Sequence, residues 1–86
     1  MSVDLNDVSQ RVKDVVVRIL KVDKAQISDE SRFVEDLGAE SMQSMELIAA
    51  FEEEFDIEMD DQAALEVKTV GEAVKFIADC LQQQGA

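Results

Sequence analysis

Four segments of the chain predict α-helices, because their apolar residues recur every three or four positions. The predicted helices run from about Val3 to Leu20, from Ser41 to about Phe55, from Asp60 or Asp61 to about Leu65, and from Thr69 to a frayed end in Gln82–Gln84. No segment shows the alternation of apolar and polar residues that a half-buried strand requires. We therefore expect a single domain (1–86) of the all-α class, a small four-helix bundle with three long helices and one short helix.

Each long helix has one apolar face, and these faces together predict the core. The expected core residues are Leu5, Val8, Val12, Val15, Val16 and Ile19 in the first helix, Met42, Met45, Leu47, Ile48, Phe51 and Phe55 in the second, and Val70, Ala73, Val74, Ile77 and Leu81 in the last. Asp4 or Ser2 can cap the first helix. Thr69, followed three residues later by Glu72, fits a capping box for the last helix.

A connection of roughly twenty residues (21–40) joins the first two helices, which is long for a compact domain. It contains apolar residues that are expected to anchor it on the helices: Val22, Ile27, Phe33, Val34 and Leu37. The segment Ser28–Ser31 has the composition of a turn and is a candidate for a short helical turn. We expect this connection to pack over the bundle.

The formal net charge is −12, and all of it arises from one segment. Residues 33–67 contain twelve Asp or Glu and no Lys or Arg, whereas the remaining residues contain eight of each sign. Nucleic acid and anionic membranes are therefore poor partners, and basic protein surfaces are better ones. Three consecutive glutamates, Glu52 to Glu54, end the second helix where they oppose its dipole. Such a local misfit is typical of a functional surface.

Several residue types that carry chemistry are missing. The chain has no histidine, which excludes a Ser-His-Asp arrangement and histidine metal ligands, so no enzyme activity, catalytic residue or metal site is expected. Its one cysteine, Cys80, cannot form an internal disulfide and is read as an apolar residue. No apolar run approaches the roughly 20 residues that span a bilayer, and the first residues do not form a signal peptide. The expected location is the cytoplasm, without membrane insertion.

The segment Phe33-Val34-Glu35-Asp36-Leu37-Gly38-Ala39-Glu40-Ser41-Met42, together with Met45-Glu46-Leu47 and Phe51–Glu58, resembles the acyl carrier protein family. This resemblance implies that Ser41 bears 4′-phosphopantetheine, attached by a phosphopantetheinyl transferase, and that the thiol of this arm carries acyl groups as thioesters. Glu40 and Met42 flank the attachment site, in place of the family's usual Asp and Leu. Gln43 stands where many members have an acid, and Asp60 where many have proline.

The resemblance also implies a docking surface for the transferase and for acyl-handling enzymes with basic patches. Its expected residues are Gln43, Met45, Glu46, Glu52, Glu53 and Met59. Exposed charges are screened within about 10 Å at ordinary ionic strength, so docking of this monomer should be weak and sensitive to salt. Phe51 is larger than the aliphatic residue frequent at its position, and we hypothesise that it narrows the acyl cavity.

Simpler interpretations of the same features stay open. Ser41 could only cap a helix, and the acidic segment could only be a solvated helix face. Asp56–Asp61 lacks the spacing of an EF-hand loop, although loose binding of divalent cations is compatible with its acidity. The alternative function is an acidic, non-catalytic adaptor of the same fold without the prosthetic group. A hydrolase that uses Ser41 is disfavoured by the missing histidine, and fatty acid, polyketide and specialised lipid pathways are all compatible with a carrier.

Overall fold

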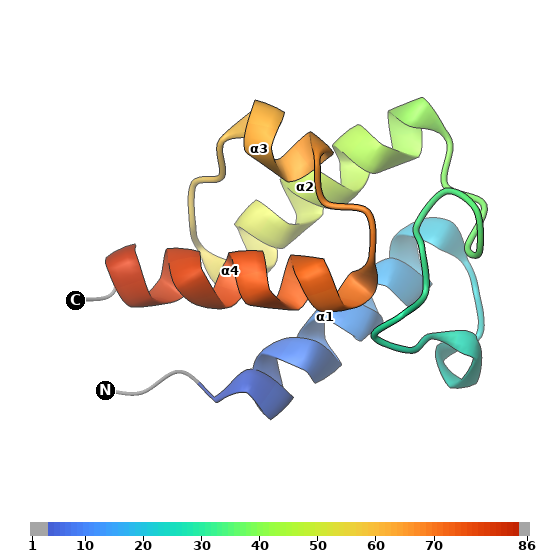
Figure 1. The fold of residues 1–86 in the computed structure, drawn as a ribbon, viewed down its shortest axis with the longest axis horizontal. Coiled ribbons are helices and arrows are strands. Elements are labelled where there is room, and N and C mark those ends of the chain that lie inside the picture. The colour runs from blue at the N-terminus through green and yellow to red at the C-terminus, as the bar shows by residue number, and fades with distance from the viewer. Residues whose placement is uncertain (1–3, 85–86) are drawn as a thin grey trace.

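The computed structural model describes residues 4–84. Within them lie the α-helices α1 (Leu5–Leu20), α2 (Ser41–Phe55), α3 (Asp61–Leu65) and α4 (Val70–Gln84), and a 3₁₀-helix, η1 (Lys24–Gln26) (Figure 1). The four predicted helices and the all-α class are confirmed. Between residues 4 and 84 the only β-type pairing is an isolated antiparallel bridge between Arg32 and Thr69.

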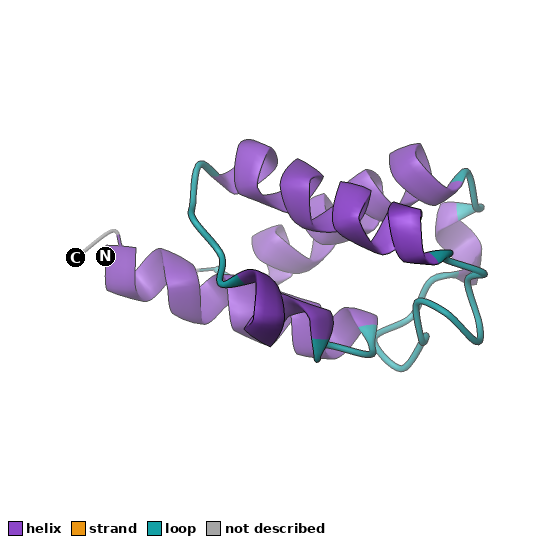
Figure 2. Cartoon of the chain, turned by 90° about the horizontal axis from the view of Figure 1, so that it is seen from above, coloured by secondary structure: helices purple, strands orange, loops and turns teal. Residues whose placement is uncertain are grey.

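Helix α1 is the central packing partner, because it contacts both α2 and α4, whereas α3 packs against α2. The start of α1 and the end of α4 lie at one end of the molecule (Figure 1). The connection 21–40 lies at the opposite end, as the view from above also shows (Figure 2). The beginning of α2 therefore emerges at the loop end of the bundle.

The core is built from the predicted apolar faces, with three exceptions. The most deeply buried side chains, all less than 2% exposed or close to it, are Val8, Val12, Val15, Val16, Val70 and Ile77. Leu5, Met42 and Met45 were expected in the core, but they are 56%, 77% and 49% exposed. A periodic pattern defines a face of a helix, and that face is buried only where another element covers it. The first turns of α1 and α2 are not covered in this way.

The connection 21–40 packs on the bundle as expected, although its details differ. Its short helical turn is η1, and Ser28–Ser31 instead forms a turn closed by the Ser31 N–H and the Ser28 carbonyl at 3.1 Å. Ile27 and Phe33 are buried, whereas Val34 is 58% exposed and is not an anchor. Val34 lies beside a cavity described below, so its apolar side chain has a wall to lie against without being enclosed.

Three backbone hydrogen bonds join this connection to the start of α4. The N–H groups of Val70 and Gly71 donate to the carbonyls of Ser31 (3.0 Å) and Asp29 (2.8 Å), and the Phe33 N–H donates to the Lys68 carbonyl (3.0 Å). Buried backbone N–H and carbonyl groups must be hydrogen-bonded, and these bonds pair such groups in a segment that has almost no secondary structure of its own. They also hold Phe33 in a fixed place beside the helices.

The helix caps follow the sequence prediction where the structure describes them. The Asp4 carboxylate accepts hydrogen bonds from two backbone N–H groups of the first turn of α1, so Asp4 is the cap, whereas Ser2 and Val3 lie outside the described residues. At α4 the Thr69 hydroxyl accepts from the Glu72 N–H, and the Glu72 carboxylate accepts from the Thr69 N–H, both at 3.1 Å. This is the predicted capping box. It holds the pKa of the Glu72 carboxyl below its ordinary value, because the N–H groups of Lys68 and Thr69 stabilise the charged form.

The glutamates that end α2 are partly explained by contacts inside the molecule. Arg11 of α1 donates from Nη2 to the Glu54 carbonyl at 2.7 Å and from Nε to the Glu54 carboxylate at 3.0 Å, and its guanidinium lies 4.4 Å from the centre of the Phe55 ring. The Glu52 carboxylate accepts from the Met59 N–H at 3.0 Å. The interpretation of all three glutamates as a misfit is therefore wrong for Glu52 and Glu54.

Candidate functional site around Ser41

Ser41 is the first residue of α2, and its side chain is exposed. The N-cap is Glu40, whose backbone is extended, so the interpretation of Ser41 as the capping residue is wrong. Four backbone hydrogen bonds close the turn before it, and Gly38 within that turn has φ +73°, a conformation that favours glycine. The hydroxyl of Ser41 makes no hydrogen bond within the part of the chain that is described, which leaves it available for attachment.

The first turn of α2 is suited to an anionic substituent on Ser41. The N–H groups at a helix start have no acceptor within the helix, and the dipole is positive there. Gln43 stabilises this end from one side, because its Oε1 accepts from the Glu40 N–H at 3.0 Å. The Glu40 side chain accepts from the Gln43 N–H in a capping box, so a phosphate ester on Ser41 would lie beside the N–H groups of Ser41 and Met42, which have no acceptor within the helix.

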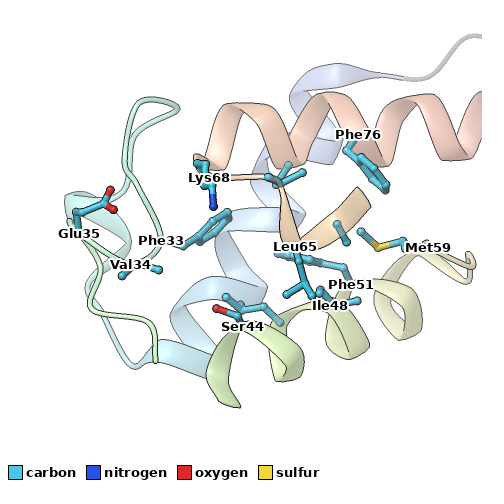
Figure 3. Close-up of a pocket in the computed structure, with 14 residues that line it drawn as sticks. Phe33, Val34, Glu35, Ser44, Ile48, Phe51, Met59, Leu65, Lys68 and Phe76 are labelled. Atoms are coloured by element: carbon cyan, nitrogen blue, oxygen red, sulfur yellow. The ribbon is translucent and has the colours of Figure 1, made fainter. Parts of the chain in front are cut away.

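The face of α2 that begins at Ser41 continues as the wall of a cavity. Ser44, Ile48 and Phe51 follow Ser41 at intervals of three, seven and ten residues, and all three line this cavity (Figure 3). Its volume is about 200 Å³. The walls come from the connection before α2, from α2, from α3 and from the start of α4: Phe33, Val34, Glu35, Ser44, Leu47, Ile48, Phe51, Met59, Ala64, Leu65, Val67, Lys68, Ala73 and Phe76.

The cavity has a polar end and an apolar end. Glu35, Ser44 and Lys68 lie toward the loop end, whereas the rings of Phe51 and Phe76 and the thioether of Met59 lie toward the other (Figure 3). Because Ser44 is one turn after Ser41, the polar end is the one nearer the candidate attachment site. The arrangement can thus receive an apolar group that enters from the side of Ser41.

The structure separates the expected docking residues into two groups. Met45, Glu46 and Glu53 are exposed, and Glu46 and Glu53 take part in no ion pair within the described residues. Gln43, Glu52 and Met59 are half-buried and make contacts inside the molecule. Of the residues that flank Ser41, Glu40 is exposed as the N-cap, and Met42 is more exposed than any other large apolar side chain in the described region.

Sequence reasoning missed three residues of this site: Val34, Leu65 and Lys68. Val34 and Leu65 are 58% and 46% exposed at the edge of the cavity, and Lys68 is its only basic lining residue. Helical periodicity gave no signal for them, because they lie in a loop, at the end of a five-residue helix and between two helices. Only tertiary packing brings them to α2.

The remaining candidate chemistry is sparse. Between residues 4 and 84 no three or more His, Cys, Asp or Glu side chains are grouped so that they could hold a metal ion. Burial, and secondarily Asp79, raise the pKa of the half-buried Cys80 thiol, so it stays protonated and unreactive at neutral pH. In this region no helix is long and apolar enough to cross a membrane.

An exposed serine at a helix start, an adjoining apolar cavity and an acidic surface define a carrier of covalently attached groups. A family model described as a phosphopantetheine attachment site matches residues 10–77. The chain is 47% identical over 77 residues to an acyl carrier protein of Phenylobacterium zucineum (strain HLK1), covering 90% of this chain and 98% of that one. It is 45% identical over 75 residues to an acyl carrier protein of Caulobacter vibrioides (strain NA1000 / CB15N), covering 87% and 96%.

Among solved structures, one described as an acyl carrier protein from Mycobacterium tuberculosis matches with a TM-score of 0.78 and 32% identity, covering 84% of this chain and 96% of that one. The chain therefore belongs to the acyl carrier protein family. Its prosthetic group is 4′-phosphopantetheine, and its function is to carry acyl groups as thioesters on that arm. Proteins of this family interact with phosphopantetheinyl transferases and with enzymes that act on acyl groups.

Proposed function

We propose that Ser41 is the residue to which phosphopantetheine is attached. The observation that carries this assignment is that the exposed hydroxyl of Ser41 begins the same face of α2 that lines the cavity through Ser44, Ile48 and Phe51. An arm attached there has the cavity beside it along the helix. The unpaired N–H groups of the first turn provide the stabilisation that a phosphodiester needs.

We propose that the surrounding residues form a docking surface of two layers. Met42, Met45, Glu46 and Glu53 are exposed and would contact a partner directly. Gln43, Glu52 and Met59 would support them, because each is held by or against the structure of α2 and the segment after it. Exposed carboxylates attract a basic patch at long range and exposed methionines adapt to apolar partners, which favours fast and reversible docking.

The carrier is proposed to be a non-catalytic, cytoplasmic monomer in which residues 1–86 act as one domain. The transferase and acyl enzymes that visit it would carry basic surface patches. Phe51 is 3% exposed and its ring faces the cavity, so we infer that a chain of moderate length fits and that a long chain stays partly outside (Figure 3). Fatty acid, polyketide and specialised lipid pathways can each supply such groups.

The test of the attachment site is intact mass spectrometry after incubation with coenzyme A and a promiscuous phosphopantetheinyl transferase. The wild-type protein should gain one phosphopantetheine, and Ser41→Ala should gain none. Ser44→Ala is the matched control, because Ser44 is a serine one turn later on the same face, and it should gain the full mass. If Ser41→Ala still gained the phosphopantetheine mass, or if only Ser44→Ala lost it, the arm would be attached to a residue other than Ser41. No gain with any transferase would favour the adaptor without a prosthetic group.

A further inference from the structure

The polar end of the cavity contains one cation whose charge is not engaged by an ion pair. Of its three polar side chains, Ser44 donates its hydroxyl to the Glu40 carbonyl at 3.3 Å, and Glu35 pairs with Arg32 at 3.3 Å. Lys68, the third, forms no salt bridge within the described part of the chain. Its ammonium is the one donor of positive charge among the residues that line the cavity.

The backbone of Lys68 is held on both sides. Its N–H donates to the Glu72 carboxylate at 3.1 Å, and its carbonyl accepts from the Phe33 N–H at 3.0 Å. These bonds fix Lys68 between the connection before α2 and the start of α4, so its side chain leaves from a fixed point. Figure 3 shows the side chain of Lys68 directed from the start of α4 toward the Phe33 ring.

A hydrocarbon cargo gains nothing from this ammonium. Lys68 would simply extend its charged end into water while its methylenes cover the rim, as lysines at apolar surfaces do. An anionic cargo is different, because a partly desolvated rim strengthens the attraction between opposite charges. Residues 33–67, which supply most of the other walls of the cavity, contain twelve acids and no base, so they offer an anion no positive partner.

We propose that Lys68 forms an anion subsite at the mouth of the cavity, which favours acyl groups that end in a carboxylate over plain hydrocarbon chains of the same length. This inference rests on the proposed attachment of the arm to Ser41. A short cargo of this kind would stay at the polar end, with its methylenes beside Val34 and Ile48 and its terminal carboxylate at Lys68, whereas a plain hydrocarbon chain would continue toward Phe51. The nearby carboxylates of Glu35 and Glu72 oppose this binding, and both already accept hydrogen bonds or ion pairs inside the protein.

The test compares two cargoes on three proteins. Holo-protein is loaded with carbon-13-labelled glutaryl or pentanoyl groups, which have equal carbon counts and differ by one carboxylate. The variants are Lys68→Met and the matched control Lys75→Met, an exposed lysine of α4 that does not line this cavity. Both variants have the same net charge, so any difference between them is local. NMR titration measures the pKa of the glutaryl carboxyl, and cleavage by hydroxylamine measures the protection of each thioester.

We expect the pKa of the glutaryl carboxyl to be about one unit lower in wild type and Lys75→Met than in Lys68→Met, as for a carboxylate near one exposed opposite charge. Lys68→Arg should restore the lower pKa, and the pentanoyl thioester should be equally protected in all variants. Equal glutaryl pKa values in Lys68→Met and Lys75→Met would overturn the subsite.

Lys68 could instead bind the phosphodiester of the arm. Holo-protein without cargo distinguishes this from binding of the cargo carboxylate. If Lys68→Met shifts the phosphorus-31 resonance of the arm while the glutaryl pKa stays unchanged, Lys68 binds the arm and the proposed cargo selection is wrong. Failure to load Ser41 at all would instead overturn the proposed function, and it is detected beforehand by intact mass.

Discussion

Arg11 links α1 to the C-terminal end of α2, and its replacement tests whether that link stabilises the fold. In Arg11→Met the methylene stem is largely kept, whereas the hydrogen bonds to the Glu54 carbonyl and carboxylate and the contact with the Phe55 ring are lost. Asp7, 3.7 Å away on the same helix, would also lose its partner. The change removes one positive charge from a protein that already has a formal net charge of −12.

The expected cost can be worked from these contacts. A hydrogen bond from a charged donor contributes about 1.5–3 kcal/mol, an exposed ion pair below about 1 kcal/mol, and a partly exposed cation over an aromatic ring about 0.5–1 kcal/mol. The side chains of Arg11 and Glu54 are 39% and 32% exposed, so solvent screens part of each contribution. Since the three contacts share one side chain, they do not add fully, and we expect a loss of about 2 kcal/mol in unfolding free energy.

Urea unfolding followed by circular dichroism at 25 °C measures this loss. The matched control is Arg18→Met, because Arg18 is an exposed arginine of α1 that takes part in no ion pair within the described residues. Both variants reach the same net charge, and Arg18→Met should change stability by no more than about 0.5 kcal/mol. If the two variants lost equal stability, the effect would come from net charge alone, and the reasoning from the Arg11 contacts would be wrong.

Three further predictions concern the loop, the cap of α4 and the acidic segment. Gly71→Ala should lower stability by about 1–3 kcal/mol in urea unfolding, because an added Cβ would lie 2.9 Å from the Asp29 carbonyl oxygen; an unchanged stability would contradict the close approach. Glu72→Gln should destabilise the protein most at neutral pH and progressively less as the pH falls below about 4.3. The lowered pKa of Glu72 gives its full stabilisation above the carboxyl's unfolded pKa, and this is lost as the pH falls through the folded pKa; a difference independent of pH would contradict the capping role. Salt or Mg²⁺ should raise the melting temperature, because either one screens the repulsion among the twelve acids in residues 33–67. A melting temperature unchanged by both would show that these acids do not repel one another.

The helices were predictable because apolar periodicity marked each long one and a cap residue marked the start of three of the four helices between residues 4 and 84. Apolar periodicity located the segments, and cap residues such as Asp4, Asp60 and Thr69 located their starts. The same reasoning misplaced Leu5, Met42 and Met45, because periodicity does not report whether a neighbouring helix covers a given turn. Tertiary packing decides whether a residue is buried, and the local pattern of apolar residues does not determine that packing.

The candidate site was predictable only in part, for a related reason. Ser41 lies within one continuous motif, so its exposure at a helix start followed from local sequence. Lys68 and Val34 join the site through hydrogen bonds between the connection 21–40 and the start of α4, at long separation in sequence. Likewise, no local signal explained Glu54 at the end of α2, and its partner Arg11 lies 43 positions earlier in the chain.

These long-range contacts also explain how an acidic carrier stays folded while it presents its charge. Among the described residues, Arg11 pairs with Glu54, and Arg32 pairs with Glu35 and Asp36; both bases lie outside the segment 33–67. Each neutralises one end of α2, at its C-terminus or in the turn that precedes it. Glu46 and Glu53 are exposed and take part in no ion pair within the described residues. If the proposed docking surface is correct, Glu53→Gln should therefore weaken docking to a basic partner without lowering the stability of the fold.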